Sequence, residues 1–157
     1  MNRRWIVTAH LQGAQTAAQT VTQVLGLPAR EAQVPSPFDL MAKIEVGLPL
    51  RALERMAALL APGDAQFKYR LVPKATYERR KASHRLNAEE GTRLARLARV
   101  WGLALDVWRD EKEARGFLFR AHAMLEDERP IDLVIRSEIG AELVLELLGR
   151  LKYGTAA

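Results

Sequence analysis

The chain contains no cysteine, so it forms neither disulfide bonds nor thiolate sites for zinc or iron–sulfur clusters, and thiol nucleophiles are excluded. A Gly-rich phosphate loop is also missing, because Gly140 and Gly149 each stand alone. The histidines, His10, His84 and His122, lie far apart and show no metal-ligand spacing. These absences predict a protein that is not an enzyme and that uses no metal or cofactor.

Long apolar runs are absent as well. None approaches the roughly 18–20 residues that span a bilayer. The apolar patch from Trp5 to Ala9 is shorter than the region of about 7–15 residues in a secretion signal. A chain without cysteine is also compatible with a reducing compartment. We therefore expect a soluble cytoplasmic protein with no membrane partner.

Strictly alternating runs of valine and isoleucine are missing apart from residues 131–135, and nearly every segment carries a helical period. This pattern predicts an all-α fold. We expect helices from Gln15 to Gly26, Pro37 to Gly47, Pro49 to Leu60, Ala65 to Leu71, Lys74 to Ser83, Asn87 to Trp108 and Asp110 to Phe119, then a loop, a turn over Pro130–Ile135 and a last helix capped by Ser137.

Two of these helices provide the predicted core. Residues 94–108 are apolar on most sides, which predicts a buried central helix with Trp101 and Trp108 packed inside. The last helix is expected to bury Leu143, Leu147, Leu148 and Leu151.

Positive charge is concentrated in the middle of the chain. The net charge is +5, but residues 64–100 hold ten Lys/Arg against four Asp/Glu, which gives +6. Residues 101–157 hold eight Lys/Arg against eleven Asp/Glu, which gives −3. This asymmetry predicts two surfaces that bind two different partners.

The basic segment is compatible with a helix-turn-helix centred on Val72-Pro73. In that motif the second helix reaches base edges with its N-terminal residues, and counterion release at the phosphates adds sequence-independent affinity. The predicted DNA-binding residues are Lys74, Thr76, Tyr77, Arg79, Arg80, Lys81 and Arg85. A solvated basic helix face carries the same kind of run, and composition alone does not decide between the two.

Longer motifs resemble a known family. Pro73, the pair Arg79-Arg80, Leu86, the pair Glu89-Glu90 and the segments RLARV and DEKEARGFL follow one another in the order seen in antitoxins of the Xre/ParS/MbcA type. The match continues through PIDL, Glu138, Gly140, LLGR and Tyr153-Gly154, and it covers roughly residues 47–154. Where the family often has a glycine pair before the PIDL segment, this chain has Leu125-Glu126-Asp127-Glu128.

Residues 1–46 lie outside the resemblance, but their apolar helical faces and low charge predict an N-terminal helical segment that can dimerise. The resemblance itself implies two parts and two partners. Residues 47–87 would be an Xre-like helix-turn-helix, and residues 88–157 a toxin-binding domain. The C-terminal domain would block a RES-domain toxin that consumes NAD, and the helix-turn-helix would repress the operon at its promoter DNA. A homodimer within a larger hetero-oligomer is expected. The predicted toxin-binding residues are Arg136, Arg150, Lys152, Tyr153 and Gly154.

Two other functions stay open at this point. A stand-alone helix-turn-helix transcriptional regulator would need the DNA surface but no toxin. An enzyme is the third hypothesis, although no convergent set of catalytic side chains supports it. Protection of cells from a toxin, DNA binding without a partner, and turnover of NAD by the chain alone would separate the three.

Overall fold

The computed structural model describes residues 15–29 and 34–154. Their regular elements are all helical: α2 (Ala17–Leu25), α3 (Pro37–Val46), α4 (Leu50–Leu60), α5 (Lys68–Leu71), α6 (Lys74–Ser83), α7 (Ala88–Trp108), α8 (Glu111–Phe119), a 3₁₀ turn η1 (Ala123–Leu125), α9 (Pro130–Arg136) and α10 (Glu138–Tyr153). The predicted all-α fold class is confirmed.

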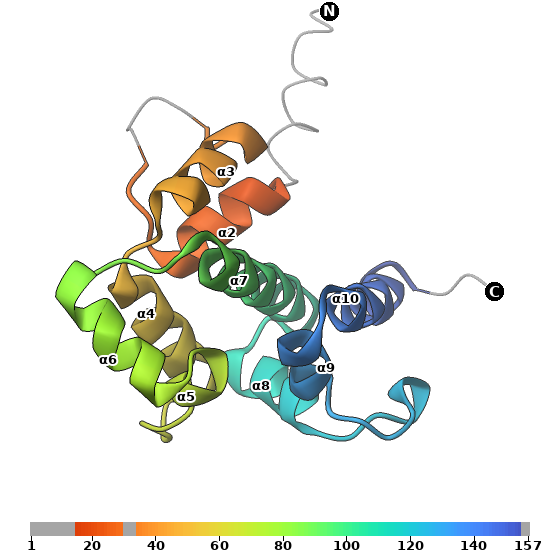
Figure 1. Cartoon of the computed structure of the whole chain (residues 1–157). Coiled ribbons are helices and arrows are strands. Elements are labelled where there is room, and N and C mark those ends of the chain that lie inside the picture. The colour runs from red at the N-terminus through yellow and green to blue at the C-terminus, as the bar shows by residue number, and fades with distance from the viewer. Residues whose placement is uncertain (1–14, 30–33, 155–157) are drawn as a thin grey trace, which may run out of the picture.

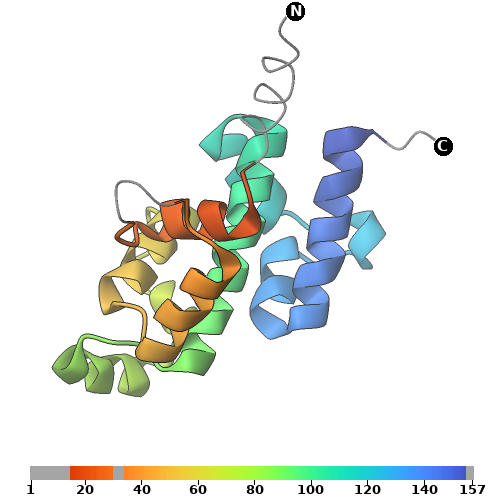
Figure 2. The same ribbon diagram turned by 90° about the horizontal axis from the view of Figure 1, so that it is seen from above.

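The long helix α7 runs through the middle of the molecule (Figure 1). Helices α4, α5 and α6 lie on one side of it, and α8, α9 and α10 lie on the other. Seen from above, α2 lies across α7, and α10 is on the side away from α3 (Figure 2). Helices α4 to α6 and helices α8 to α10 therefore lie on opposite sides of α7.

Local capping explains where most helices begin and end. Thr16, Ser36 and Asn87 each accept a hydrogen bond from the third residue of the helix that follows, whose side chain returns a bond to the cap backbone. Gly26 ends α2 with a φ of 63°, a left-handed conformation that costs glycine no steric strain. These helix boundaries agree with those predicted from the sequence.

Helix α7 is the central core helix that its apolar pattern predicts. Trp101 is almost fully buried, and Leu94, Leu97 and Ala98 are buried with it. Trp108, however, is 39% exposed, so its predicted burial is wrong. Trp108 is the last residue of α7, and its ring packs against Phe117 of α8 while its outer side stays uncovered by the helices of the described residues.

Two glycines allow close helix contacts: Gly102 lets α2 approach α7, and Gly140 lets α9 approach α10. A Cβ atom at Gly102 would lie 2.1 Å from Thr20 Cγ2, so α2 can cross α7 only where a side chain is missing. A Cβ atom at Gly140 would lie 2.1 Å from the carbonyl oxygen of Leu133, so α9 can pack this closely on α10 only because position 140 has no side chain. At Gly140 an added methyl group would meet backbone, which cannot give way, whereas at half-buried Gly102 the Thr20 side chain would have to move.

Two predicted elements differ from the structure. The helix expected from Ala65 begins at Lys68, because the Asp64 side chain accepts a hydrogen bond from the Gln66 backbone at 2.8 Å and holds a turn there. The predicted turn over Pro130–Ile135 is helix α9. Proline is favourable at the first helical position, and the helical spacing buries Ile131 and Val134 together.

None of the described helices combines the length and the apolar character that crossing a bilayer requires. The predicted signal-like patch at Trp5–Ala9 lies outside the described residues.

Candidate nucleic-acid-binding and partner-binding surfaces

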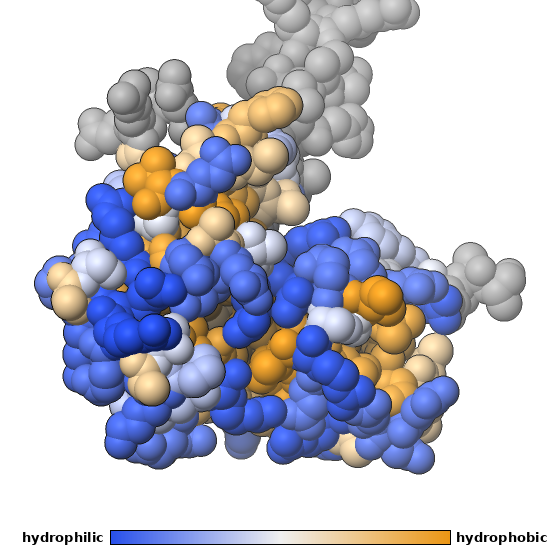
Figure 3. Space-filling view, viewed as in Figure 1, coloured by the Kyte–Doolittle hydropathy of each residue, from blue (hydrophilic) through white to orange (hydrophobic). Residues whose placement is uncertain are grey.

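Helices α5 and α6 are joined by the two-residue turn Val72-Pro73, as the helix-turn-helix prediction requires. Val72 has an extended backbone, and its side chain and that of Leu71 are buried, which fixes the angle between the helices. Helix α6 covers the predicted residues Lys74–Ser83. Its outer side forms part of a hydrophilic face of the molecule (Figure 3).

The outer side of α6 carries Lys74, Arg79 and Lys81, which are exposed, and Thr76, which is half-buried. Lys81 forms an ion pair with Glu78 at 3.0 Å, so part of its charge is cancelled. Arg79 donates a hydrogen bond to the Thr76 hydroxyl at 3.3 Å and forms no ion pair with a described acidic residue. Lys74 and Arg79 are therefore the residues of α6 with both an exposed position and an uncancelled charge.

Tyr77 does not belong to this outer surface. It is 2% exposed, and its hydroxyl donates a hydrogen bond to Glu54 of α4 and accepts one from Lys68 at 3.3 Å. The bond to Glu54 and burial raise the pKa of Tyr77. We therefore correct its predicted role: in this structure Tyr77 holds α6 against α4 and reaches no base. Tyr77 is the one large apolar side chain of Lys74–Ser83, and this is the signal that could have placed it inside.

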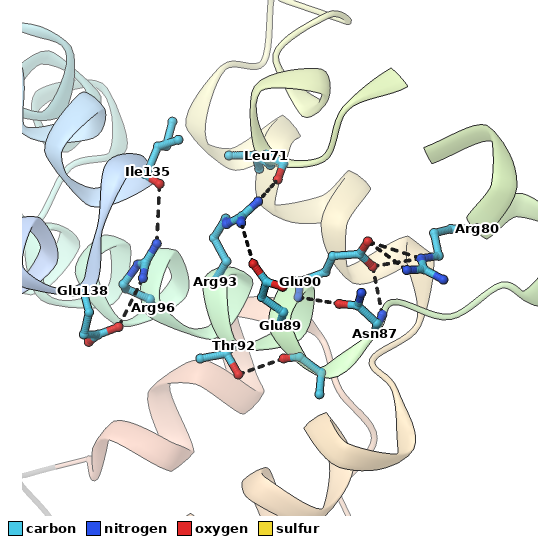
Figure 4. A network of polar contacts seen from close by, with 11 residues as sticks. Leu71, Arg80, Asn87, Glu89, Glu90, Thr92, Arg93, Arg96, Ile135 and Glu138 are labelled. Atoms are coloured by element: carbon cyan, nitrogen blue, oxygen red, sulfur yellow. Dashed lines mark hydrogen bonds and ion pairs between the residues drawn. The ribbon is translucent and has the colours of Figure 1, made fainter. Parts of the chain in front are cut away.

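Arg80 and Arg85 are held by the protein itself. Arg80 binds both carboxylate oxygens of Glu90, with Nε–Oε2 at 3.0 Å, and Glu90 also closes the capping box with Asn87 at the start of α7 (Figure 4). Arg85 donates to the carbonyl oxygen of Gly47 at 3.2 Å. Arg80 is thus neutralised, whereas Arg85 keeps its full charge.

The unneutralised cations gather in one part of the chain. Most described lysines and arginines form an ion pair with a described acidic residue. The lysines and arginines without such an ion pair fall into two groups. Those in the first part of the described chain are Lys43, Arg51, Arg55, Lys68, Lys74, Arg79 and Arg85, and those after residue 86 are Lys112 and Arg120. Most of the uncancelled positive charge therefore lies on the α3–α6 side of the molecule, and the rest lies around α8. Lys43, Arg51, Arg55 and Lys68 have no motif spacing, so the sequence did not single them out.

The predicted toxin-binding cations are all paired. Arg136 binds Glu128, which lowers the pKa of the Glu128 carboxyl below its ordinary value. Arg150 pairs with Glu146 one turn away on α10, and Lys152 pairs with Asp106 of α7, which raises the pKa of Lys152. Each of these groups would have to break an internal ion pair before it could bind a partner's anion.

The outer side of α10 carries exposed apolar side chains beside the Glu146–Arg150 pair. Ile139 is 76% exposed, Tyr153 is 78% exposed, and Leu143 and Leu151 are nearly half exposed. The predicted burial of Leu143 and Leu151 is therefore wrong, because Ala141, Val144 and Leu148 form the side that faces α7 and α9. Helical period alone could not tell which of two apolar sides faces the core. Gly154, which ends α10 with a φ of 68°, is also exposed.

Two protein-family models match this chain in consecutive segments. The antitoxin Xre-like helix-turn-helix domain matches residues 39–99, and the antitoxin Xre/MbcA/ParS C-terminal toxin-binding domain matches residues 103–154. The chain belongs to the Xre/MbcA/ParS-type antitoxins. It is thus an antitoxin of a toxin–antitoxin pair with a helix-turn-helix part and a toxin-binding part. No curated protein matches the chain.

The hairpin before α9 stands out in the toxin-binding part of the antitoxin. Glu126 and Asp127 have φ values of 55° and 60°, a left-handed conformation that glycine adopts without strain. Here the backbone of His122 holds the hairpin closed, since its N–H donates to Glu128 and its carbonyl accepts from Asp127. The Arg136 pair fixes Glu128 in addition. Local hydrogen bonds and this ion pair therefore hold the two left-handed residues of the hairpin in place.

The two parts of the antitoxin share polar contacts across α7. Arg70 of α5 binds Asp132 of α9 at 2.6 Å, and Arg129 binds the same carboxylate. Burial alone would raise the pKa of Asp132, but the two guanidinium groups hold it below its ordinary value. From α7, Arg93 donates to the carbonyl oxygen of Leu71 in α5, and Arg96 binds Glu138 of α10 and the carbonyl of Ile135 (Figure 4).

Proposed function

We propose that this antitoxin blocks a RES-domain toxin, an NAD-consuming enzyme, through its C-terminal part and represses its own operon through α6. The observation that carries the proposal is the separation of two chemically different surfaces on opposite sides of α7. One bears uncancelled cations around α6, and the other bears the exposed apolar side of α10. Together with the two domain matches, this separation supports a division of labour between DNA and toxin.

The exposed side of α10 supports a toxin contact that is mainly apolar. Exposed patches of this kind on a protein mark binding surfaces, whereas isolated apolar residues do not. Ile139, Leu143 and Tyr153 follow one another along the outer side of the helix, and the Glu146–Arg150 ion pair lies between the last two. We therefore place these apolar side chains and Arg150 at the centre of the contact, with the predicted Arg136 and Lys152 at its rim.

Co-expression with the toxin encoded by the neighbouring gene tests this function. We expect the unchanged antitoxin to protect cells and to co-purify with the toxin. Leu143→Asp should abolish both while leaving promoter binding intact, and Arg79→Gln should weaken promoter binding while leaving protection intact. Ala58→Asp, at an exposed position on α4, is the matched control for an added carboxylate. Promoter binding without any protection would identify a stand-alone regulator instead.

A second copy of the chain is proposed to dock on α3. This helix has no buried residue, and Phe38 is 79% exposed beside the exposed Met41 and Val46. The apolar surface over α3 (Figure 3) supports the proposed dimerisation through residues 1–46, and with it a homodimer inside a larger complex with toxin. Phe38→Asp should convert the antitoxin to a monomer in sedimentation analysis, and an unchanged mass would remove α3 from the interface.

A further inference from the structure

A groove of about 540 Å³ opens beside the C-terminal end of α6. Its walls come from the residues after α2, the end of α3, the loop to α4 and its first turn, and the residues after α6. Two backbone hydrogen bonds close one wall: Leu50 N–H donates to His84 at 2.9 Å, and Leu86 N–H donates to Leu48 at 2.8 Å. The groove is therefore preformed by the fold.

The charged side chains of this groove are all basic. Lys43, Arg51 and Arg85 line it together with His84, and no acidic side chain of residues 15–29 and 34–154 does. None of the three strong cations forms an ion pair within the described residues. The groove thus concentrates positive charge that nothing in the described chain neutralises.

Two of these cations are positioned without being cancelled. Lys43 Nζ donates to the carbonyl oxygen of Pro28 at 2.5 Å, and Arg85 donates to that of Gly47 at 3.2 Å. A backbone carbonyl orients a cation but carries no net charge to offset it. A solvated basic face would instead leave such side chains free to move or would pair them with carboxylates. This arrangement favours an anion as the missing partner.

Apolar residues also line the groove: Leu27 is buried, Pro49 is half-buried and Val46 is exposed. Apolar lining lowers the local dielectric constant below that of bulk water, which strengthens the charge interactions beside it. It also suits the sugar carbons that flank a phosphodiester. A small inorganic anion would leave this apolar lining uncovered.

We propose that this groove binds the phosphodiester backbone of DNA next to the segment that α6 reads. The proposal rests on the proposed DNA-binding function and extends it beyond α6. Arg85 lines the groove and directly follows α6 and its C-cap His84, so the two surfaces are continuous. The groove binds backbone and carries no base readout, so its contribution is the same for every sequence.

The test measures binding of the full-length antitoxin to a promoter duplex and to an unrelated duplex over a series of salt concentrations. The variant is Lys43→Gln with Arg51→Gln. The control is Lys112→Gln with Arg120→Gln, which removes the same charge from two exposed, unpaired cations around α8. If each groove cation neutralises one phosphate, the slope of log K against log salt falls by about 1.8 for the groove variant on both duplexes. The control slope stays unchanged.

Three results decide the matter. A smaller slope in the groove variant alone supports the proposal. If Arg79→Gln weakens binding but the groove variant behaves like its control, the groove is not a DNA contact, while the proposed function stands. If the unchanged antitoxin binds neither duplex, the proposed DNA function itself fails. Arg51→Gln alone removes no contact within the described residues, so it keeps the test usable should the double variant unfold.

Discussion

The contact between α9 and α10 gives the sharpest test of the fold. Gly140 and Gly149 lie on the same helix, and alanine at either position would gain about 1 kcal/mol of helix propensity. They differ in the space around them. A Cβ atom at Gly140 would meet the Leu133 carbonyl oxygen at 2.1 Å and its carbon at 2.7 Å, whereas nothing lies within 4 Å of one at Gly149. The two substitutions therefore isolate the packing effect.

The backbone of Leu133 cannot rotate away as a flexible side chain would. Helix α10 must move outward by more than an ångström to restore an ordinary contact, and this separates the fully buried Ala141 and Val144 from their neighbours. Overpacking of this kind costs up to about 3 kcal/mol. After the gain in helix propensity, Gly140→Ala should lose about 2 kcal/mol of unfolding free energy.

Thermal unfolding followed by circular dichroism measures the difference. For a chain of this length, each kcal/mol shifts Tm by roughly 2–4 °C. Gly140→Ala should therefore lower Tm by about 4–8 °C, and Gly149→Ala should raise it by about 2–4 °C. Equal Tm values for the two variants would refute the close approach of α9 and α10, and with it the derived shape of the toxin-binding part.

Three further predictions concern other contacts. Gly102→Ala should lower Tm, because its Cβ would lie 2.1 Å from the β-branched side chain of Thr20 at the crossing of α2 and α7. Asn87→Ala should cost about 1 kcal/mol in urea unfolding through loss of the α7 cap; an unchanged midpoint would contradict that cap. The Arg136 pair lowers the pKa of Glu128 from 4.5, so its stabilisation is complete above that pH and disappears as the pH falls through the lower folded value. Glu128→Gln should therefore make the unfolding midpoint less sensitive to acidification, and an unaltered pH dependence would argue against the pair.

Arg80 is a poor position at which to test DNA binding by mutation, although the sequence suggests it. From the sequence it is the centre of the basic segment, and its removal would report on phosphate contacts. In the structure it is bound to Glu90, which is itself part of the α7 cap. Its substitution would weaken folding and DNA binding together, whereas Arg79→Gln changes only an exposed charge.

The sequence by itself determined most helix boundaries, the all-α class and the division of charge. Caps such as Ser36 and Asn87 act within one turn of the chain, so their signals can be read locally. The resemblance to the antitoxin family was also readable, because its motifs are contiguous.

Only the tertiary structure decided which charged and apolar groups are available to partners. Arg70 pairs with Asp132, and Lys152 pairs with Asp106, although the partners lie far apart in the sequence. A local sequence pattern therefore cannot predict that these charges are paired. The apolar side of α10 that faces solvent, and the burial of Tyr77, likewise depend on which helices pack alongside. A residue's type and spacing fix what it can bind, but its neighbours in space fix whether that capacity is already used.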